Sequence, residues 1–178
     1  KAYGMDGPTG GCVFWWLATM AFAVQIYCDF SGSSDIARGL ANWMGYEFPE
    51  NFRHLYRSVS LRDFWSRWHI SLSTWFRDYV YIPLGGSKQS AARSHVNMWI
   101  TMALSGLWHG AGWNFLIWGM MHAALLSIER LTGWPRRLMS FRFGRVASVL
   151  LTFCLVMLTW VFFRSESTAQ AVMIVKTM

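Results

Sequence analysis

Charged residues and cysteines are both scarce in this chain of 178 residues. Only 14% of the residues are charged, whereas an ordinary soluble domain has roughly 25%. The three cysteines show no Cys-x-x-Cys spacing, so the sequence indicates neither a zinc site nor a disulfide framework. We therefore interpret Cys12, Cys28 and Cys154 as reduced residues that pack within apolar sequence.

The common catalytic motifs are absent as well. The chain has no HExxH zinc motif, no GxSxG nucleophile motif and no glycine-rich phosphate loop. The paired HxxxH motifs of a di-iron membrane oxidase are also missing. We predict no metal site and no bound cofactor, which leaves an enzyme that uses histidine as a base, or no enzyme. No leader pattern opens the chain and residues 169–178 resemble an unfinished helix, so we expect a fragment of a longer polypeptide.

Apolar and aromatic residues are abundant instead. They make up 54% and 17% of the chain, and the twelve Trp suit a protein with many membrane–water boundaries. A soluble protein with a very aromatic core is the alternative. The formal net charge is +7, but Lys and Arg lie in connectors beside apolar runs, as they do in cytoplasmic loops. We therefore interpret the charge as membrane topology and predict no nucleic-acid partner.

Three uncharged or nearly uncharged runs, residues 12–30, 94–128 and 146–163, are predicted to be helical. The middle run would be roughly 52 Å long as one helix, more than a bilayer core needs. We expect a break around Gly106 to Gly112 that gives two short helices, as a hairpin or re-entrant piece with both basic flanks on one side. The predicted fold class is all-α: a polytopic membrane helical bundle with interfacial amphipathic helices, in a single membrane domain over 1–178.

An amphipathic connector, residues 31–93, separates the first two runs. We predict a short helix from Asp35, capped by Ser33 or Ser34. A second helix should cover residues 60–82 and end before Pro83, because its apolar residues recur at spacings of three and four. That stripe comprises Leu61, Trp65, Trp68, Leu72, Trp75, Tyr79 and Ile82. Such a helix would lie in the membrane interface or pack beneath the bundle.

Histidines in apolar sequence are the main candidates for chemistry, because an ionisable group at membrane depth is costly to bury. His109 lies in the expected break, where a neutral imidazole would accept a proton. A packed histidine bound to a backbone carbonyl is an equally good interpretation of it. His69 is the second candidate, with a solvated interfacial histidine as the alternative, and His122 is interpreted as structural. For Asp29 and for Arg77–Asp78, an ion pair or helix cap is the simpler interpretation.

Several longer motifs then resemble one known family. They are Tyr27-Cys-Asp-Phe-Ser-Gly-Ser-Ser-Asp-Ile-Ala-Arg-Gly39, Pro49-Glu-Asn-Phe52, Phe64-Trp-Ser-Arg-Trp-His-Ile-Ser-Leu-Ser-Thr-Trp-Phe-Arg-Asp-Tyr-Val-Tyr-Ile-Pro-Leu-Gly-Gly86, Ser105-Gly-Leu-Trp-His-Gly-Ala111, Trp118-Gly-Met-Met-His122 and Trp160-Val-Phe-Phe-Arg-Ser165. Together they are similar to the alginate O-acetyltransferase branch of the membrane-bound O-acyltransferases and, less closely, to the D-alanyl-transferring branch.

The resemblance implies an enzyme of the bacterial inner membrane that moves an acyl group, expected to be acetyl, from a cytoplasmic donor toward an exopolysaccharide hydroxyl. It implies that His109 is the catalytic histidine and that His69 is a second one on the cytoplasmic side of a tunnel. The predicted substrate-binding residues are Trp108, Ser105, Asn114, Ser73, Arg77 and Asp78. The donor would be acetyl-CoA or an acyl carrier, and the partners would be membrane lipids, periplasmic polysaccharide-acetylation proteins and the polysaccharide. D-alanyl transfer to a wall polymer, or a transport component without chemistry, are the alternatives.

Overall fold

The structure is a computed structural model that describes residues 10–178, and every regular element within that range is helical. The main helices are α1 (Cys12–Trp43), α4 (Ala91–Trp108), α5 (Trp113–Thr132) and α7 (Gly144–Arg164). The shorter elements are η2 (Leu55–Arg57), α2 (Leu61–Trp65), α3 (Ile70–Phe76), η3 (Arg77–Tyr81), α6 (Trp134–Met139) and α8 (Thr168–Thr177). The all-α prediction is confirmed for the described residues.

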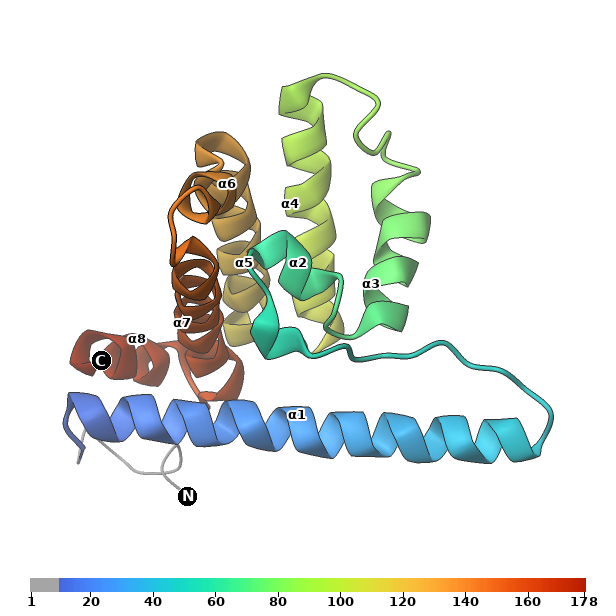
Figure 1. The fold of residues 1–178 in the computed structure, drawn as a ribbon, viewed down its shortest axis with the longest axis horizontal. Helices are drawn as coiled ribbons and strands as arrows, with labels where there is room; N and C mark the ends of the chain where they lie inside the picture. The colour runs from blue at the N-terminus through green and yellow to red at the C-terminus, as the bar shows by residue number, and fades with distance from the viewer. Residues whose placement is uncertain (1–9) are drawn as a thin grey trace.

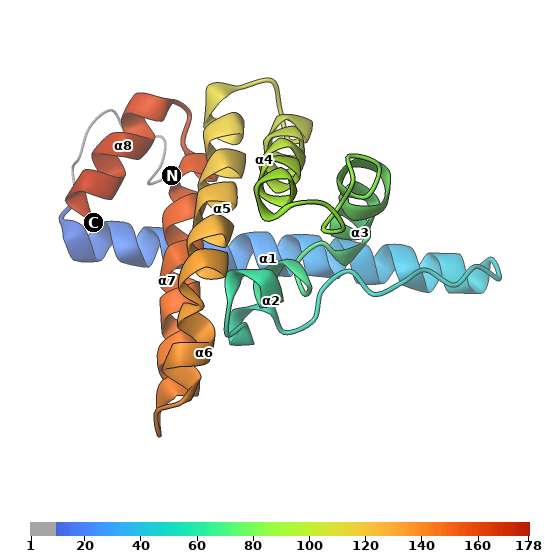
Figure 2. The ribbon, with the colours of Figure 1, turned by 90° about the horizontal axis from the view of Figure 1, so that it is seen from above.

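Helices α4, α5 and α7 pack as neighbours, and α1 runs across the end of this group instead of alongside it (Figures 1 and 2). Of the described helices, α1 and α7 are long and apolar enough to cross a membrane, by length and composition. Because α1 lies across α7, the two helices cannot both follow one membrane normal. Helix α7 matches the predicted run 146–163 within two residues at its start and one at its end.

The first helix continues well beyond the predicted end at Phe30. It reaches Trp43 without interruption, so the predicted separate helix with a cap at Ser33 or Ser34 is wrong. The Ser33 hydroxyl instead donates to the backbone carbonyl of Asp29 at 2.7 Å, within the helix. A serine side chain that bonds back to the preceding turn no longer competes with the helix for backbone groups.

The prediction of a broken middle run is confirmed. Helices α4 and α5 form an antiparallel hairpin, and residues 109–112 make the turn between them (Figure 1). At the far end Arg130 donates to the Ser94 hydroxyl at 2.8 Å, so both basic flanks lie at the same end of the hairpin. The break itself begins later than expected, because Gly106 belongs to α4 and is buried.

Gly106 has a packing role in place of the expected helix-breaking one. A methyl group at Gly106 would overlap the carbonyl oxygen of Phe115, and one at Gly119 would overlap the carbonyl oxygen of Met102. Each of these two glycines faces the backbone of the other half of the hairpin. Small residues that let two helix backbones approach closely are typical of helix pairs in membrane proteins.

The predicted helix over residues 60–82 is wrong in one important respect. It is interrupted between Trp65 and Ile70, where His69 adopts a left-handed backbone conformation with φ of 45°. The backbone N–H of Ile70 donates to the carbonyl of Asn51, and that of Arg53 donates to Arg67. The preceding loop therefore binds the break through tertiary hydrogen bonds that no periodic pattern reports. The predicted stop before Pro83 is confirmed.

The hydrophobic core is rich in tryptophan. Trp15, Trp118 and Trp160 are each 1% exposed, and Phe64 and Trp68 pack with them. Several tryptophans therefore build the interior instead of marking a membrane interface, although Trp43, Trp108 and Trp113 are exposed. The cysteine prediction is wrong in part: all three are free, but they lie exposed on the surface of the described chain.

Candidate functional site

His109 directly follows α4, in the turn of the hairpin. Its half-buried ring makes edge contacts with Trp118 at 5.3 Å and with Phe163 at 5.1 Å between ring centroids. These partners come from α5 and α7, so three helices fix the ring. Among residues 10–178 no hydrogen bond joins either ring nitrogen of His109 to the protein. The nitrogens are therefore available to a substrate, and the alternative of a histidine bound to a backbone carbonyl is not what the structure shows.

His69 is held more tightly, in the break between α2 and α3. It is 9% exposed, and its ring packs edge-on against Phe30 of α1 at a centroid distance of 4.6 Å. Its Nδ1 lies 3.3 Å from Oδ1 of Asn51. The same oxygen accepts from the backbone N–H and the hydroxyl of Ser71, at 3.1 and 3.0 Å. The solvated-histidine alternative does not hold, since the ring is buried.

The Asn51 contact sets the tautomer of His69. Because Oδ1 of Asn51 is a carbonyl oxygen, Nδ1 must be the protonated, donating nitrogen and Nε2 must carry the lone pair. Burial, and less strongly the neighbouring His109, lowers the pKa of His69 from 6.5 to about 4. The ring is therefore neutral at pH 7, with one nitrogen able to accept a proton.

The structure brings the two candidate histidines together. Trp108 contacts both rings, at a centroid distance of 5.1 Å from His109 and 6.2 Å from His69. The two imidazoles thus share one aromatic neighbour at the turn of the α4–α5 hairpin, where α1 crosses. Separation by forty positions in sequence hid this proximity, and only the break at His69 makes it possible.

The other predicted substrate-binding residues fall into two groups. Ser105 is buried in α4 next to the turn, and Asn114 lies in the first turn of α5. The Asn114 amide is already engaged, because it donates to the Ser165 carbonyl and accepts from the Thr168 hydroxyl, both at 2.7 Å. These two bonds fasten the hairpin to the α7–α8 junction.

Three predicted residues lie further along the connector. The Ser73 hydroxyl donates to the carbonyl of Trp68 at 3.2 Å, which closes the turn after His69. Arg77 and Asp78 form an exposed ion pair at 2.7 Å, so the simpler interpretation of this pair is confirmed. That pair raises the pKa of Arg77 and lowers the pKa of Asp78, mainly through the hydrogen bond between them. The contacts found for Arg77 and Asp78 join them to each other and not to the histidines.

His122 is a structural histidine, as predicted. It is fully buried, the Trp65 indole donates to its Nδ1 at 3.3 Å, and its Nε2 lies 3.0 Å from the Thr159 hydroxyl. That hydroxyl gives its own proton to the Val156 carbonyl, so it accepts from Nε2–H. Both nitrogens are satisfied, and no solvent reaches them.

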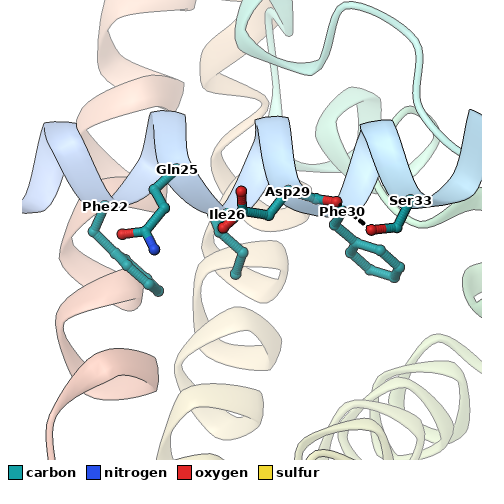
Figure 3. Close-up of a pocket in the computed structure, with 6 residues that line it drawn as sticks. All are labelled: Phe22, Gln25, Ile26, Asp29, Phe30 and Ser33. Atoms are coloured by element: carbon teal, nitrogen blue, oxygen red, sulfur yellow. Dashed lines mark hydrogen bonds between the residues drawn. The ribbon is translucent and has the colours of Figure 1, made fainter.

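Two open cavities are lined in part by residues that contact the histidine pair, although neither His69 nor His109 lines them. The larger, of about 770 Å³, is lined by Gly112, Trp113 and Asn114 of the hairpin turn and by Phe163, which contacts His109. The smaller, of about 350 Å³, lies along α1 and includes Phe30, which contacts His69 (Figure 3). Phe22 and Ile26 line both cavities, so the two cavities adjoin along α1.

Sequence reasoning missed one residue of this site. Asn51 lies within one of the family motifs, but its role could not be predicted, because its contact with His69 joins residues 18 positions apart. Asp29 was interpreted as an ion pair or cap, which is wrong: it lies inside α1, and none of the ion pairs among residues 10–178 includes it.

The structure is thus that of a membrane-associated helical protein. Its candidate active site is a pair of histidine side chains at the turn of an apolar helical hairpin. The chain belongs to the membrane-bound O-acyltransferase family, whose model matches residues 8–169. The predicted family is thus confirmed, and with it the assignment to a membrane protein.

Several curated relatives match most of the chain. It is 47% identical to the probable alginate O-acetylase AlgI of Pseudomonas syringae, over 93% of this chain and 31% of that protein. It is 37% identical to the peptidoglycan O-acetyltransferase of Helicobacter pylori, over 92% and 31%. It is 32% identical to the teichoic acid D-alanyltransferase of Bacillus subtilis, over 74% and 36%. The chain spans about a third of the length of these relatives.

Proposed function

We propose that this chain carries the histidine centre of an O-acyltransferase that moves an acyl group from a thioester donor to a hydroxyl acceptor. The observation that carries the proposal is the pair His109 and His69 around Trp108, with ring nitrogens of His109 that no group among residues 10–178 occupies. The relatives named as O-acetyltransferases and D-alanyltransferases support the same class of reaction.

In this mechanism His109 is the general base. The hydroxyl oxygen of the acceptor attacks the thioester carbonyl carbon while His109 takes the hydroxyl proton. The carbon–sulfur bond then breaks, and the proton passes from the imidazole to the departing thiolate. General-base help of this kind contributes roughly 10²- to 10⁴-fold in rate. Because Nδ1 of His69 donates to Asn51, its Nε2 would act as a second proton acceptor or hydrogen-bond acceptor.

The first turn of α5 would stabilise the charge that develops on the carbonyl oxygen. The opening N–H groups of a helix lack partners within that helix, and its N-terminus carries a partial positive charge. Trp113 and Asn114 begin α5 and line the larger cavity, as does Phe163, whose ring contacts His109. Preorganised N–H donors of this kind often supply several kcal/mol of transition-state stabilisation, about 3–4 kcal/mol per donor.

The finer assignment follows the relatives. We propose acetyl as the group, acetyl-CoA or an acyl carrier on the cytoplasmic side as the donor, and an exopolysaccharide such as alginate as the final acceptor. Membrane lipids surround the helices, and periplasmic polysaccharide-acetylation proteins complete the transfer. The protein would cross the bacterial inner membrane several times.

The test compares single histidine variants of the full-length protein in cells. His109→Ala is expected to abolish polymer acetylation, and His69→Asn is expected to reduce it at least tenfold. Asparagine is chosen at position 69 because it tolerates the left-handed backbone there. The matched control is His54→Asn, at an exposed histidine with a similar φ of 43°. Membrane insertion is followed by immunoblotting of membrane fractions. Acetylation that survives in the inserted His109→Ala protein would exclude the base role.

A further inference from the structure

Helix α2 is too short to be stable by itself. It has five residues, Leu61–Trp65, and it precedes the break that contains His69. Forming the first turn of a helix costs more conformational free energy than its few hydrogen bonds contribute, so an isolated helix of this length does not persist in water. In the structure α2 lies beside α5 (Figures 1 and 2), and contacts with other segments must therefore hold it.

Local sequence satisfies only some of the backbone donors at the start of α2. The Ser60 hydroxyl accepts from the N–H of Asp63 at 3.0 Å, and the Asp63 carboxylate accepts from the N–H of Val59 at 3.1 Å. This arrangement is similar to the reciprocal bonds of a capping box. It leaves the N–H groups of Leu61 and Arg62, the first two of the helix, without a partner inside α2.

Glu129, in the last turn of α5, binds these two donors. One carboxylate oxygen accepts from the N–H of Leu61 at 2.6 Å, and the other accepts from that of Arg62 at 3.3 Å. A carboxylate is unfavourable near the C-terminus of its own helix but favourable at the N-terminus of another. Glu129 takes part in none of the ion pairs among residues 10–178. Its negative charge therefore stabilises α2 and not α5.

A second contact holds the other end of α2 against α5. His122 lies about two turns before the carboxylate on the same helix, and its Nδ1 accepts from the Trp65 indole at 3.3 Å. Phe64 stacks on the His122 ring at a centroid distance of 6.3 Å and on the Trp68 ring at 6.1 Å. Trp68 is the residue before His69. The placement of α2 on α5 is therefore passed to His69 through one short segment.

We infer that Glu129 is a positioning residue for His69, because its carboxylate fixes the start of α2 and so the direction in which the chain enters the break. His69 contacts Trp108 only because the chain turns between α2 and α3. Asn51 holds this turn from one side, and Glu129 with His122 holds it from the other. Loss of the carboxylate would leave the first two N–H groups of α2 without an acceptor and free the turn to shift. The catalytic consequence rests on the proposed function, because that function assigns a role to His69.

Hydrogen exchange of the full-length protein in detergent measures whether α2 is released. Glu129→Leu removes both acceptors and should speed the exchange of the amides over residues 61–69 about tenfold, while exchange in α4 changes less than about twofold. Glu129→Gln keeps one carbonyl oxygen and should give an intermediate rate. Glu47→Leu and Glu47→Gln are the matched controls, since Glu47 is an exposed residue of the loop after α1. Unchanged exchange over residues 61–69 in both Glu129 variants would overturn the inference.

Polymer acetylation in cells, normalised to the membrane-inserted protein, tests the link to His69. Glu129→Leu should lower acetylation about tenfold and Glu129→Gln about threefold, in line with the number of acceptors lost. In the His69→Asn background, Glu129→Leu should lower the residual acetylation less than about twofold, because the side chain that it positions is already absent. If the Leu protein does not insert, the Gln variant provides the same comparison.

The two sets of measurements keep the inference and the proposed function apart. Equal factors of loss with and without His69→Asn would show that Glu129 does not act through His69, and the inference would fail while the proposed function stands. Full acetylation by His69→Asn would reject the proposed role of His69. Faster exchange over residues 61–69 in Glu129→Leu would in that case still show that Glu129 fixes the turn.

Discussion

His122 and His109 both touch Trp118, yet they occupy opposite kinds of surroundings. His122 is closed in, with both nitrogens bonded to Trp65 and Thr159. His109 lies in the hairpin turn, half-buried and surrounded by aromatic rings, and no protein group among the described residues takes its nitrogens. The comparison shows that a shared aromatic cluster supports a structural histidine on its inner side and a reactive one on its outer side.

The largest effect on stability is expected from removal of the buried His122 side chain. His122→Ala removes a buried ring and leaves the Trp65 indole and Thr159 hydroxyl without partners, so unfolding should become easier by about 3–5 kcal/mol. His109→Ala should cost less than about 1 kcal/mol, because no hydrogen bond is lost. Thermal unfolding in detergent, followed by tryptophan fluorescence, checks both. Equal losses of stability would contradict the division of roles.

The second-largest effect is expected from a substitution between the two helices of the α4–α5 hairpin, whose turn contains His109. Gly106→Ala forces a methyl group into the Phe115 carbonyl and should destabilise the protein by about 1–3 kcal/mol while lowering acyl transfer, since the turn must shift. Gly39→Ala in α1 meets no atom within 4 Å and serves as the control, with neutral or slightly improved stability expected. A Gly106→Ala protein with wild-type activity would show that the close helix approach does not position His109.

Asn51 tests whether His69 needs a fixed tautomer. Asn51→Asp keeps an acceptor for Nδ1 and should retain most of the activity, whereas Asn51→Leu removes the acceptor and should lower acyl transfer about tenfold. Protein levels in the membrane must be matched, because Asn51 also accepts from Ser71. Equal activity of the Asn51→Asp and Asn51→Leu proteins would contradict the prediction.

The smallest effect concerns pH. Burial lowers the pKa of His69 to about 4, so between pH 6.5 and pH 4 the unfolded chain binds a proton there that the folded chain does not. The stability that comes from this neutral ring is fully present above pH 6.5 and is lost as the pH falls toward 4. The drop in Tm over that interval should therefore be shallower in His69→Asn than in the wild type. Parallel Tm curves for the two proteins would show that His69 does not titrate in this way.

Much of the local structure was predictable from sequence. The run over residues 94–128 is too long and too glycine-rich for one helix, and it folds as the expected hairpin with His109 in the turn. The uncharged run over residues 146–163 forms α7. These features follow from chain length, hydropathy and glycine, which act within a few turns of helix, and the family motifs identify the same two histidines.

What only the tertiary structure decided depends on contacts between distant segments. The periodic stripe over residues 60–82 predicts an unbroken helix, but hydrogen bonds from Asn51 and Arg53 stabilise a break that places His69 beside Trp108. Likewise α1 continues past its serines and crosses the hairpin, which exposes Asp29 along a cavity instead of pairing it. Periodicity records the preference of one segment for one face. It holds no information on which backbone groups another segment will satisfy, so the assembled site became visible only in the folded chain.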